Sequence, residues 1–397
     1  MLTASAIPET KFRIESIDIL RGLIMIIMAL DHTRDFFHLF GTDPTNLATT
    51  TPILFFTRWI THFCAAIFVF LSGVSVNLSS VRRSKKQLSI FLLKRGLWLI
   101  AVEFVFITFA ITLDPLYHLL IFQVIWVIGV SMILLALLIW LPLPVIAGIG
   151  ILLFFGHDLI TGMNLPLNGV SGFLWKLFFT AFGAFIEMNK THALIILYAI
   201  LPWTGVMLLG YVLGEVYRPT FDLKKRKQIV LTSGITLTLL FLLLRTFNIY
   251  GDPAPWKIQS TTALSVISFF NVSKYPPSLM YLCMTIGPGL IFLSAVEKVE
   301  NAFTRMLALY GSVPFFYYVL HFYLLRVLNI VLFFIQGYGV SDIVTKDSIM
   351  LFRPEQFGVN LSGVYLIWLL VIGILYFPCR WFSKYKKSHQ QWWLSYL

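Results

Sequence analysis

The feature that most restricts the fold of this chain is a series of about ten apolar segments, most of them roughly twenty residues long. A helix of that length spans the hydrocarbon core of a bilayer, which is about 30 Å thick. Only 12% of the 397 residues are charged, too few for the surface of a soluble domain of this size. The pattern predicts an all-α, polytopic membrane protein that forms a single domain over residues 1–397. The predicted spans are residues 17–40, 53–78, 88–113, 116–141, 145–160, 194–217, 229–249, 278–296, 306–335 and 364–382.

Lysine and arginine concentrate after the second predicted span, after the sixth, and in the tail. The residues concerned are Arg82, Arg83, Lys85, Lys86, Lys94, Arg95, Arg218, Lys224, Lys225, Arg226, Lys227, Arg380, Lys384, Lys386 and Lys387. Positive residues mark cytoplasmic loops, which is consistent with ten crossings and with both termini in the cytoplasm. Because topology accounts for the formal net charge of +12, we expect no nucleic-acid partner.

A dense group of ionisable residues lies inside the first predicted span, in the run Asp31-His32-Thr-Arg34-Asp35. Ionisable groups in a bilayer cost several kcal/mol unless they are paired or hydrated, so the cluster predicts a functional site. We take His32, Asp31, Asp35 and Arg34 as the candidate catalytic residues. Asp35 follows His32 by about one turn and is expected to orient its ring, with Asp31 as the competing candidate.

Further ionisable side chains fall inside other predicted spans. Counting about 1.5 Å per residue places nearly all of them in the outer half of the bilayer. This common depth predicts a polar cavity that opens to the outside, lined by the first, second, third, seventh and ninth spans. The residues expected there to bind substrate or to stabilise an oxyanion are Arg58, His62, Glu103, Arg245 and His321.

The same side chains also have purely structural explanations, and the sequence leaves these open. Residues one helical turn apart can neutralise or hydrogen-bond one another without any ligand. The alternatives are neutralisation of Asp31 by Arg34, a hydrogen bond between Arg58 and His62, an ion pair between Glu103 and Arg245, and packing roles for His62 and His321.

The three cysteines give no sign of a metal or disulfide site. Cys64, Cys283 and Cys379 all lie in apolar spans and lack the paired spacing of metal-binding motifs. We expect them to be core residues, and we expect no metal.

Short motifs in the first and second spans resemble those of membrane acyltransferases. Asp18, Arg21 and Gly22 follow Arg13, and His32 stands fourteen residues after Asp18, which resembles the first-helix signature of that group. The run Phe68-Val-Phe-Leu-Ser-Gly resembles its second-helix element.

Other motifs resemble the bacterial branch related to heparan-α-glucosaminide N-acetyltransferase. The Asp31-His-x-Arg-Asp-Phe-Phe run, the segment 56–63 and Lys274-Tyr-Pro-Pro are similar to that branch. Tyr318-Val-Leu-His321 resembles a late Tyr-x-x-His element of the wider membrane acyltransferase group. There is a departure from the lysosomal enzyme, which has Asn-Tyr where this chain has Asp31-His32. Its essential histidine comes some residues later, nearer to His38, so either His32 or His38 is the essential histidine here.

The resemblance implies an enzyme of the bacterial cytoplasmic (inner) membrane, with a multi-pass transmembrane acyltransferase domain. It implies transfer of an acyl group, expected to be acetyl, from cytoplasmic acyl-CoA to a sugar or glycan acceptor on the outer side. The resemblance thus implies acyl-CoA, expected to be acetyl-CoA, as the co-substrate. It also adds Lys274 to the residues expected to bind substrate or stabilise an oxyanion. The partners are the lipid bilayer and the glycan, and a homodimer is left open.

Two mechanisms and a second class of function stay open at this point. His32 could act as a general base for direct transfer, or could carry the acyl group itself. Arg34, Arg58 or Arg245 could stabilise the oxyanion. The alternative function is that of a transporter or flippase, which would also need an outward-facing polar cavity.

Overall fold

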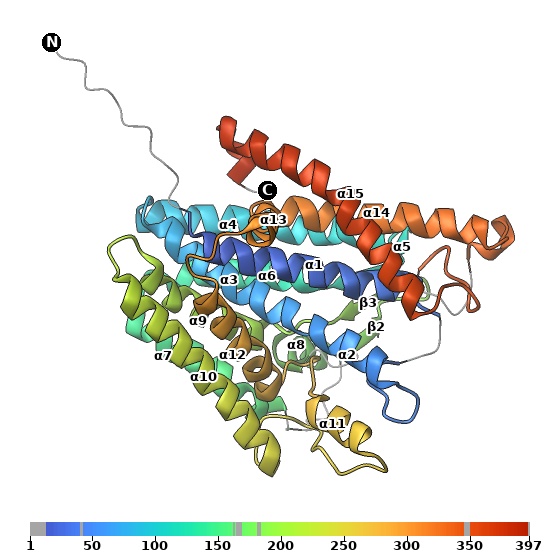
Figure 1. The fold of residues 1–397 in the computed structure, drawn as a ribbon, viewed down its shortest axis with the longest axis horizontal. Helices are drawn as coiled ribbons and strands as arrows, with labels where there is room; N and C mark the ends of the chain where they lie inside the picture. The colour runs from blue at the N-terminus through green and yellow to red at the C-terminus, as the bar shows by residue number, and fades with distance from the viewer. Residues whose placement is uncertain are drawn as a thin grey trace.

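The structure is a computed structural model that describes residues 13–39, 43–161, 163, 169–180, 184–344 and 350–395. Within these residues the chain is mostly helical, as expected (Figure 1). Six helical segments of the described chain are long and apolar enough to cross a membrane, which makes this a multi-pass membrane protein. The segments are Pro52–Ser80, Leu143–Ile160, Ile200–Tyr217, Leu223–Phe247, Pro314–Ile335 and Leu361–Ser388. The ten crossings and the cytoplasmic termini stay predictions.

The elements follow the order of the predicted spans, with several additions. The helices are α1 Glu15–Phe37, α2 Pro52–Thr61, α3 Phe63–Ser80, α4 Lys85–Val102, α5 Thr108–Thr112, α6 Val124–Leu138, α7 Leu143–Thr161, α8 Gly169–Trp175, α9 Ile200–Leu213, α10 Leu223–Phe247, α11 Thr262–Phe270, α12 Leu279–Ala295, α13 Ala302–Gly311, α14 Pro314–Ile335 and α15 Leu361–Ser388. Two π-helical turns, Glu103–Ile107 and Lys176–Thr180, extend α4 and α8. The strands are β1 Leu119–Phe122, β2 Ala184–Glu187 and β3 Ala193–Ile196.

The chain departs from the all-α expectation by forming one small sheet with the strand order β1-β3-β2. β1 pairs parallel to β3, and β2 pairs antiparallel to it. β1 and β3 occupy the beginnings of the predicted spans 116–141 and 194–217. Short, continuously apolar runs fit a buried strand as well as a helix, so the sequence pattern alone could not separate the two.

Two predicted spans are each divided into two helices. Span 53–78 breaks at His62, between α2 and α3. Span 306–335 was predicted as a single segment, but α13 ends at Gly311 and α14 begins at Pro314. Proline lacks the amide hydrogen that a continuing helix needs and fits the first turn of a new helix. The predicted span is therefore two separate helices.

α1 lies at the centre of the helical bundle and contacts α2, α3, α12, α13, α14 and α15 (Figure 1). It begins at the end of the bundle where α15 finishes and where α3 turns into α4, which we call the basic end. Its other end lies toward α2 and the sheet, which we call the opposite end. The side chains of α1 are therefore presented to the interior along most of its length.

The first-helix signature fixes α1 against its neighbours at the basic end. A Cβ atom at Gly22 would lie 1.8 Å from the carbonyl oxygen of Leu307, and one at Gly311 would lie 1.9 Å from that of Asp18. The two backbones thus touch where only glycine fits. Arg21 donates to Asp18 at 3.2 Å, to the Gly311 carbonyl at 3.3 Å and to the Ser75 hydroxyl at 2.9 Å. Asp18, Arg21 and Gly22 hold α1, α3 and α13 together, which is a structural role.

We expect Gly22→Ala to destabilise the protein, because the added methyl group must push α1 and α13 apart. Overpacking of this kind costs about 1–3 kcal/mol, and a backbone carbonyl cannot move aside as a side chain can. Gly148→Ala is the matched control, since a Cβ there meets nothing within 4 Å. Thermal unfolding of both variants in nanodiscs measures the difference. Equal melting temperatures would contradict the proposed close contact.

Candidate active site

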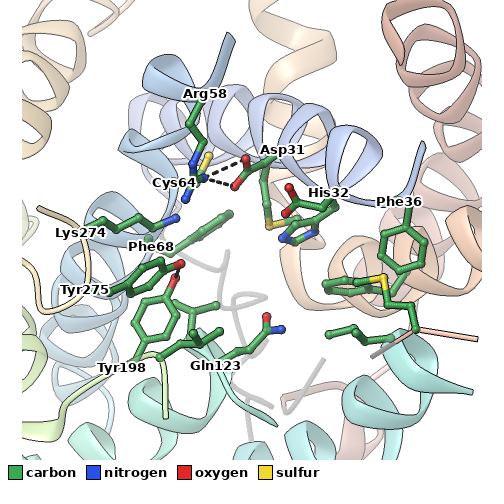
Figure 2. Close-up of a pocket in the computed structure, with 18 residues that line it drawn as sticks. Asp31, His32, Phe36, Arg58, Cys64, Phe68, Gln123, Tyr198, Lys274 and Tyr275 are labelled. Carbon is green, nitrogen blue, oxygen red and sulfur yellow. Dashed lines mark hydrogen bonds and ion pairs between the residues drawn. The ribbon is translucent and has the colours of Figure 1, made fainter. Parts of the chain in front are cut away.

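A cavity of about 130 Å³ lies beside the opposite end of α1 and contains His32 (Figure 2). Its wall brings together five of the side chains singled out in the sequence, namely Asp31, His32, Asp35, Arg58 and Lys274. The wall also includes Gln123, Tyr198, Tyr275 and Cys64, which sequence reasoning did not assign to a site. Tyr275 could have been found, because it is part of the Lys274-Tyr-Pro-Pro motif. Tyr198 and Gln123 carry no local signal, because each follows a short strand whose position depends on the sheet.

The His32 ring is held by a second histidine. Its Nδ1 lies 2.7 Å from Nε2 of His321, and the two ring planes are nearly parallel, at 19°, with their centroids 5.0 Å apart. Phe322 covers the His32 ring at a centroid distance of 4.4 Å. A carboxylate from Asp35 or Asp31 was expected in this position, but His321 takes it. His321 itself is 0% exposed and is not among the residues that line the cavity.

Asp31 is the centre of a buried ion cluster. Both of its carboxylate oxygens accept from Arg58 Nη1, at 2.9 and 2.7 Å. Arg34 lies 2.8 Å from Asp31 and 2.6 Å from the more exposed Asp35. The two carboxylates and two guanidinium groups balance in charge. The expected neutralisation of Asp31 by Arg34 is present, and Arg58 adds a link from α1 to α2.

Lys274 is the third cation of this site. Unlike the two arginines, it has no carboxylate among its described contacts. It is 8% exposed, and its Nζ lies 5.1 Å from the centroid of the Tyr275 ring. Figure 2 shows Arg58, Lys274 and Tyr275 on one side of the cavity and His32 on the other. Burial alone would raise the pKa of Tyr275, but the charges of Lys274 and Arg58 outweigh burial, and its pKa lies below its usual range. This side of the cavity is therefore suited to binding negative charge.

Two of the predicted cavity residues have other environments. Arg245 donates to the backbone carbonyls of Phe269, Ala254, Ser268 and Asn271 and lies 3.7 Å from Asp252, so it anchors the chain on both sides of α11. Glu103 accepts from the backbone N–H of Trp126 at 3.0 Å. The suggested ion pair between Glu103 and Arg245 is not formed in the described structure, and neither residue lines the His32 cavity.

His62 and His38 lie outside the His32 cavity. His62 stands at the break between α2 and α3, where its Nδ1 lies 3.0 Å from the backbone carbonyl of Arg58. The expected hydrogen bond between these two residues therefore involves the main chain of Arg58. His38 ends α1, and its carbonyl accepts from Arg353 at 3.1 Å. Of the two histidines proposed as essential, His32 is the one that lines the cavity.

A larger cavity of about 910 Å³ adjoins the first one and shares Arg58, Lys274 and Tyr275 with it. We call it the outer cavity. Its remaining wall is formed by α8 with the π turn after it, and by the segments 43–45, 253–254 and 271–276. His62 and Arg34 line it, together with polar and aromatic side chains such as Asp43, Asn271 and Trp175.

A narrow, mainly apolar cavity of about 90 Å³ adjoins the first one from the other direction. We call it the inner cavity, and it shares Phe68 and Val124 with the His32 cavity. It extends to Ser72 and Arg95. Arg95 and Arg83 both lie over the Phe91 ring, at 5.9 and 4.2 Å.

Arg83 in turn lines a cavity of about 340 Å³ at the basic end, the basic cavity. Its cationic side chains are Arg13, Arg82, Arg83, Lys386 and Lys387. The inner and outer cavities each share lining residues with the His32 cavity, which therefore lies between them. The basic cavity shares no lining residue with the inner cavity, but Arg83 of the one and Arg95 of the other both lie over the Phe91 ring.

The part of the chain that the structure describes contains no group of three or more His, Cys, Asp or Glu side chains arranged to hold a metal ion. Cys64, Cys283 and Cys379 are buried and free, as core residues are. The polar groups in the wall of the His32 cavity are an imidazole, two phenols, an ammonium, an amide, a thiol and members of the ion cluster.

The fold and this site define a multi-pass membrane protein with a histidine-containing cavity between two adjoining cavities. The family model for heparan-alpha-glucosaminide N-acetyltransferase, catalytic, matches residues 13–250, which is more than half of the chain. The chain belongs to this family, as its motifs had indicated. No curated protein sequence matches the chain. The match includes the ion cluster and His32, whereas Lys274 and His321 lie beyond it.

Membership of this family indicates that the chain is a membrane acetyltransferase that acts on a glycan. The family uses acetyl-CoA as the acetyl donor. The donor of this chain, its acceptor and the side from which each arrives are taken up below as proposals.

We expect Asp31→Asn to destabilise the fold strongly, because it leaves two buried guanidinium groups with reduced compensation. Removing one partner of a buried ion pair costs about 3–5 kcal/mol. Asp43→Asn in the exposed loop before α2 is the control and should have little effect. Melting temperatures in nanodiscs provide the measurement. A double-mutant cycle with Arg58→Gln should show coupling, and strictly additive effects would argue against the cluster.

Proposed function

We propose that this protein transfers an acetyl group from cytoplasmic acetyl-CoA to a sugar or glycan acceptor on the outer side of a bacterial inner membrane. The observation that carries the proposal is the position of His32, in the cavity between the inner and outer cavities. A base at that point can meet a thioester from one side and an acceptor from the other. Both reactants then stay separated until they reach the same 130 Å³ space.

The donor route would begin at the basic end. The phosphates of CoA are anionic. The basic cavity, which Arg83 lines, and Arg95 in the inner cavity both offer positive charge to them. The pantetheine arm is long and thin, which suits the narrow inner cavity between Phe68 and Arg95. Basic residues at a membrane surface also follow from topology alone, so their convergence on a cavity is what supports a binding role.

The acceptor route would lead through the outer cavity. Sugar rings bind to aromatic faces and to polar side chains, and Trp175, Asn271 and Asp43 supply both kinds of contact. Arg58, Lys274 and Tyr275 stand where this cavity meets the His32 cavity. An acceptor hydroxyl or amine that passes them would reach His32.

The proposed reaction needs one base and one site for negative charge. The free nitrogen of His32 accepts the proton of the acceptor as its oxygen or nitrogen bonds to the thioester carbon. Lys274, with Arg58 beside it, stabilises the oxyanion that develops. The C–S bond then breaks, and the CoA thiolate takes the proton back from His32. The alternative in which His32 itself carries the acetyl group uses the same groups in two steps.

A carrier remains the competing function, because a series of cavities between the two ends of the bundle is also what transport requires. The two functions differ in whether a covalent bond is exchanged. CoA release therefore separates them.

We expect His32→Ala to abolish acetyl transfer by purified protein in nanodiscs. Loss of a general base lowers turnover by about 10²–10⁴-fold. The measurement is CoA release and label transfer from radiolabelled acetyl-CoA, with and without a panel of sugars. His38→Ala, outside the cavity, is the control and should keep activity. Label that stays on wild-type protein without acceptor would indicate the acetyl-histidine route.

Two outcomes would contradict the proposal. Activity that survives in His32→Ala but is lost in His38→Ala would assign the role to His38. Wild-type protein that releases no CoA with any sugar, yet accumulates solute in liposomes, would favour the carrier.

Arg95→Gln tests the donor route. We expect the KM for acetyl-CoA to rise about tenfold or more with little change in kcat, because a charged contact to phosphate contributes about 1.5–3 kcal/mol. Lys94→Gln is the matched control, since Lys94 is the adjacent exposed cation on α4 and lines none of the four cavities. Equal effects of the two substitutions would mean that only general surface charge matters.

A further inference from the structure

We infer that His321 is a positioning residue that holds His32 in a single tautomer, with hydrogen on Nδ1 and the lone pair of Nε2 directed into the cavity. The catalytic consequence rests on the proposed function, but the tautomer itself does not. The inference starts from the 2.7 Å contact between His32 Nδ1 and His321 Nε2. Two ring nitrogens at that distance must share one hydrogen, so one ring donates and the other accepts.

The far side of His321 decides which ring donates. His321 Nδ1 lies 3.3 Å from the backbone carbonyl of Tyr317, one turn earlier on α14. A carbonyl oxygen only accepts, so Nδ1 of His321 carries the hydrogen. In a neutral ring, Nε2 then has a lone pair and no hydrogen. His32 must therefore donate from Nδ1, and its own Nε2 is the atom left to accept a proton.

Packing around His321 leaves few alternative hydrogen-bond partners for its ring. The ring is 0% exposed, and it lies against Tyr317 at a centroid distance of 5.7 Å and against Phe322 at 4.4 Å. No described carboxylate contacts it. The ring therefore has no contact with bulk solvent.

The charged groups near His32 do not take over the positioning. Asp31 and Asp35 on α1 are engaged by Arg34, and Asp31 is also engaged by Arg58 of α2. Lys274 approaches from the loop before α12 and is itself a donor only. These five groups surround the site without a hydrogen bond to the ring in the described structure. His321 does for His32 what a carboxylate does in a serine-type triad, but with a neutral partner.

The break before α14 explains why His321 can reach this position. α14 begins at Pro314, so its register is set independently of α13. Tyr317, His321 and Phe322 then fall on buried positions, with Tyr317 and His321 one turn apart. In a single helix through 306–335, the residues before Pro314 would set the direction in which Tyr317, His321 and Phe322 point.

The test reads the tautomer directly. Wild-type protein labelled with ¹⁵N-histidine in nanodiscs is examined by ¹⁵N–¹H correlation spectra, with His32→Gln to assign the signals. We expect a protonated Nδ1 and an unprotonated Nε2 for His32. His321→Gln keeps an acceptor for Nδ1–H and should preserve that pattern, whereas His321→Ala should give a mixture of tautomers. His192→Gln is the control, because His192 is only partly buried and lines none of the four cavities.

Kinetics add a second measurement that a purely structural role would not reproduce. His321→Ala should lower kcat by between about 10-fold and 10⁴-fold while the KM for acetyl-CoA stays near that of the wild type. His321→Gln should restore most of kcat. Equal loss in the two variants, with unchanged spectra, would overturn the positioning role.

A protonated Nε2 on wild-type His32 would overturn the inference whatever the activity. If the wild-type protein transfers no acetyl group, the spectra still decide the tautomer, so failure of the proposed function is distinguishable. If His321→Ala does not fold, the wild-type spectrum and His321→Gln still decide the outcome.

Discussion

The structure around the candidate site depends on the buried carboxylate of Asp31. A single charge of this kind inside a membrane protein would be very unfavourable, and the two guanidinium groups of Arg58 and Arg34 make it tolerable. The cluster fixes the depth and rotation of α1 against α2, because each partner must stay within hydrogen-bond distance. Because His32 is the next residue on α1, the same constraint determines its position in the cavity. The ion cluster is thus a framework for the histidine more than a source of catalytic groups.

The opposite wall of the cavity is positioned by residues that never reach it. Lys274 and Tyr275 lie in the loop before α12, and Asp252 accepts from the Ser273 backbone N–H and from the Ser278 hydroxyl. Arg245 donates to two carbonyls in the last turn of α11 and to one on each side of this helix, and it lies beside Asp252. Such a network holds a loop at a fixed place without touching substrate. Arg245 thus helps to hold this loop, which differs from the oxyanion role expected of it.

The sequence identified site residues where an ionisable group stands in an apolar segment. It did not identify contacts between residues that are far apart in the chain. An ionisable run in an apolar segment needs compensation, so Asp31, His32 and Arg34 could be singled out from one chain. The same argument also selected Glu103 and Arg245, because depth alone does not reveal which cavity a side chain faces. His321 could be named as a polar residue in a span, but its contact with His32 spans 289 positions and has no local signal. The strands β1 and β3 were missed because a short apolar run satisfies either kind of element.

A neutral partner for His32 is consistent with the charge balance of the site. Asp31 and Asp35 already match Arg34 and Arg58, and Lys274 adds a positive charge across the cavity. A further carboxylate at the ring would need its own compensation in a poorly hydrated interior. A histidine that donates to the Tyr317 carbonyl supplies the required acceptor without adding charge. In the proposed reaction, the proton that His32 accepts would stay on its own ring, because His321 could take it only by becoming a fully buried cation.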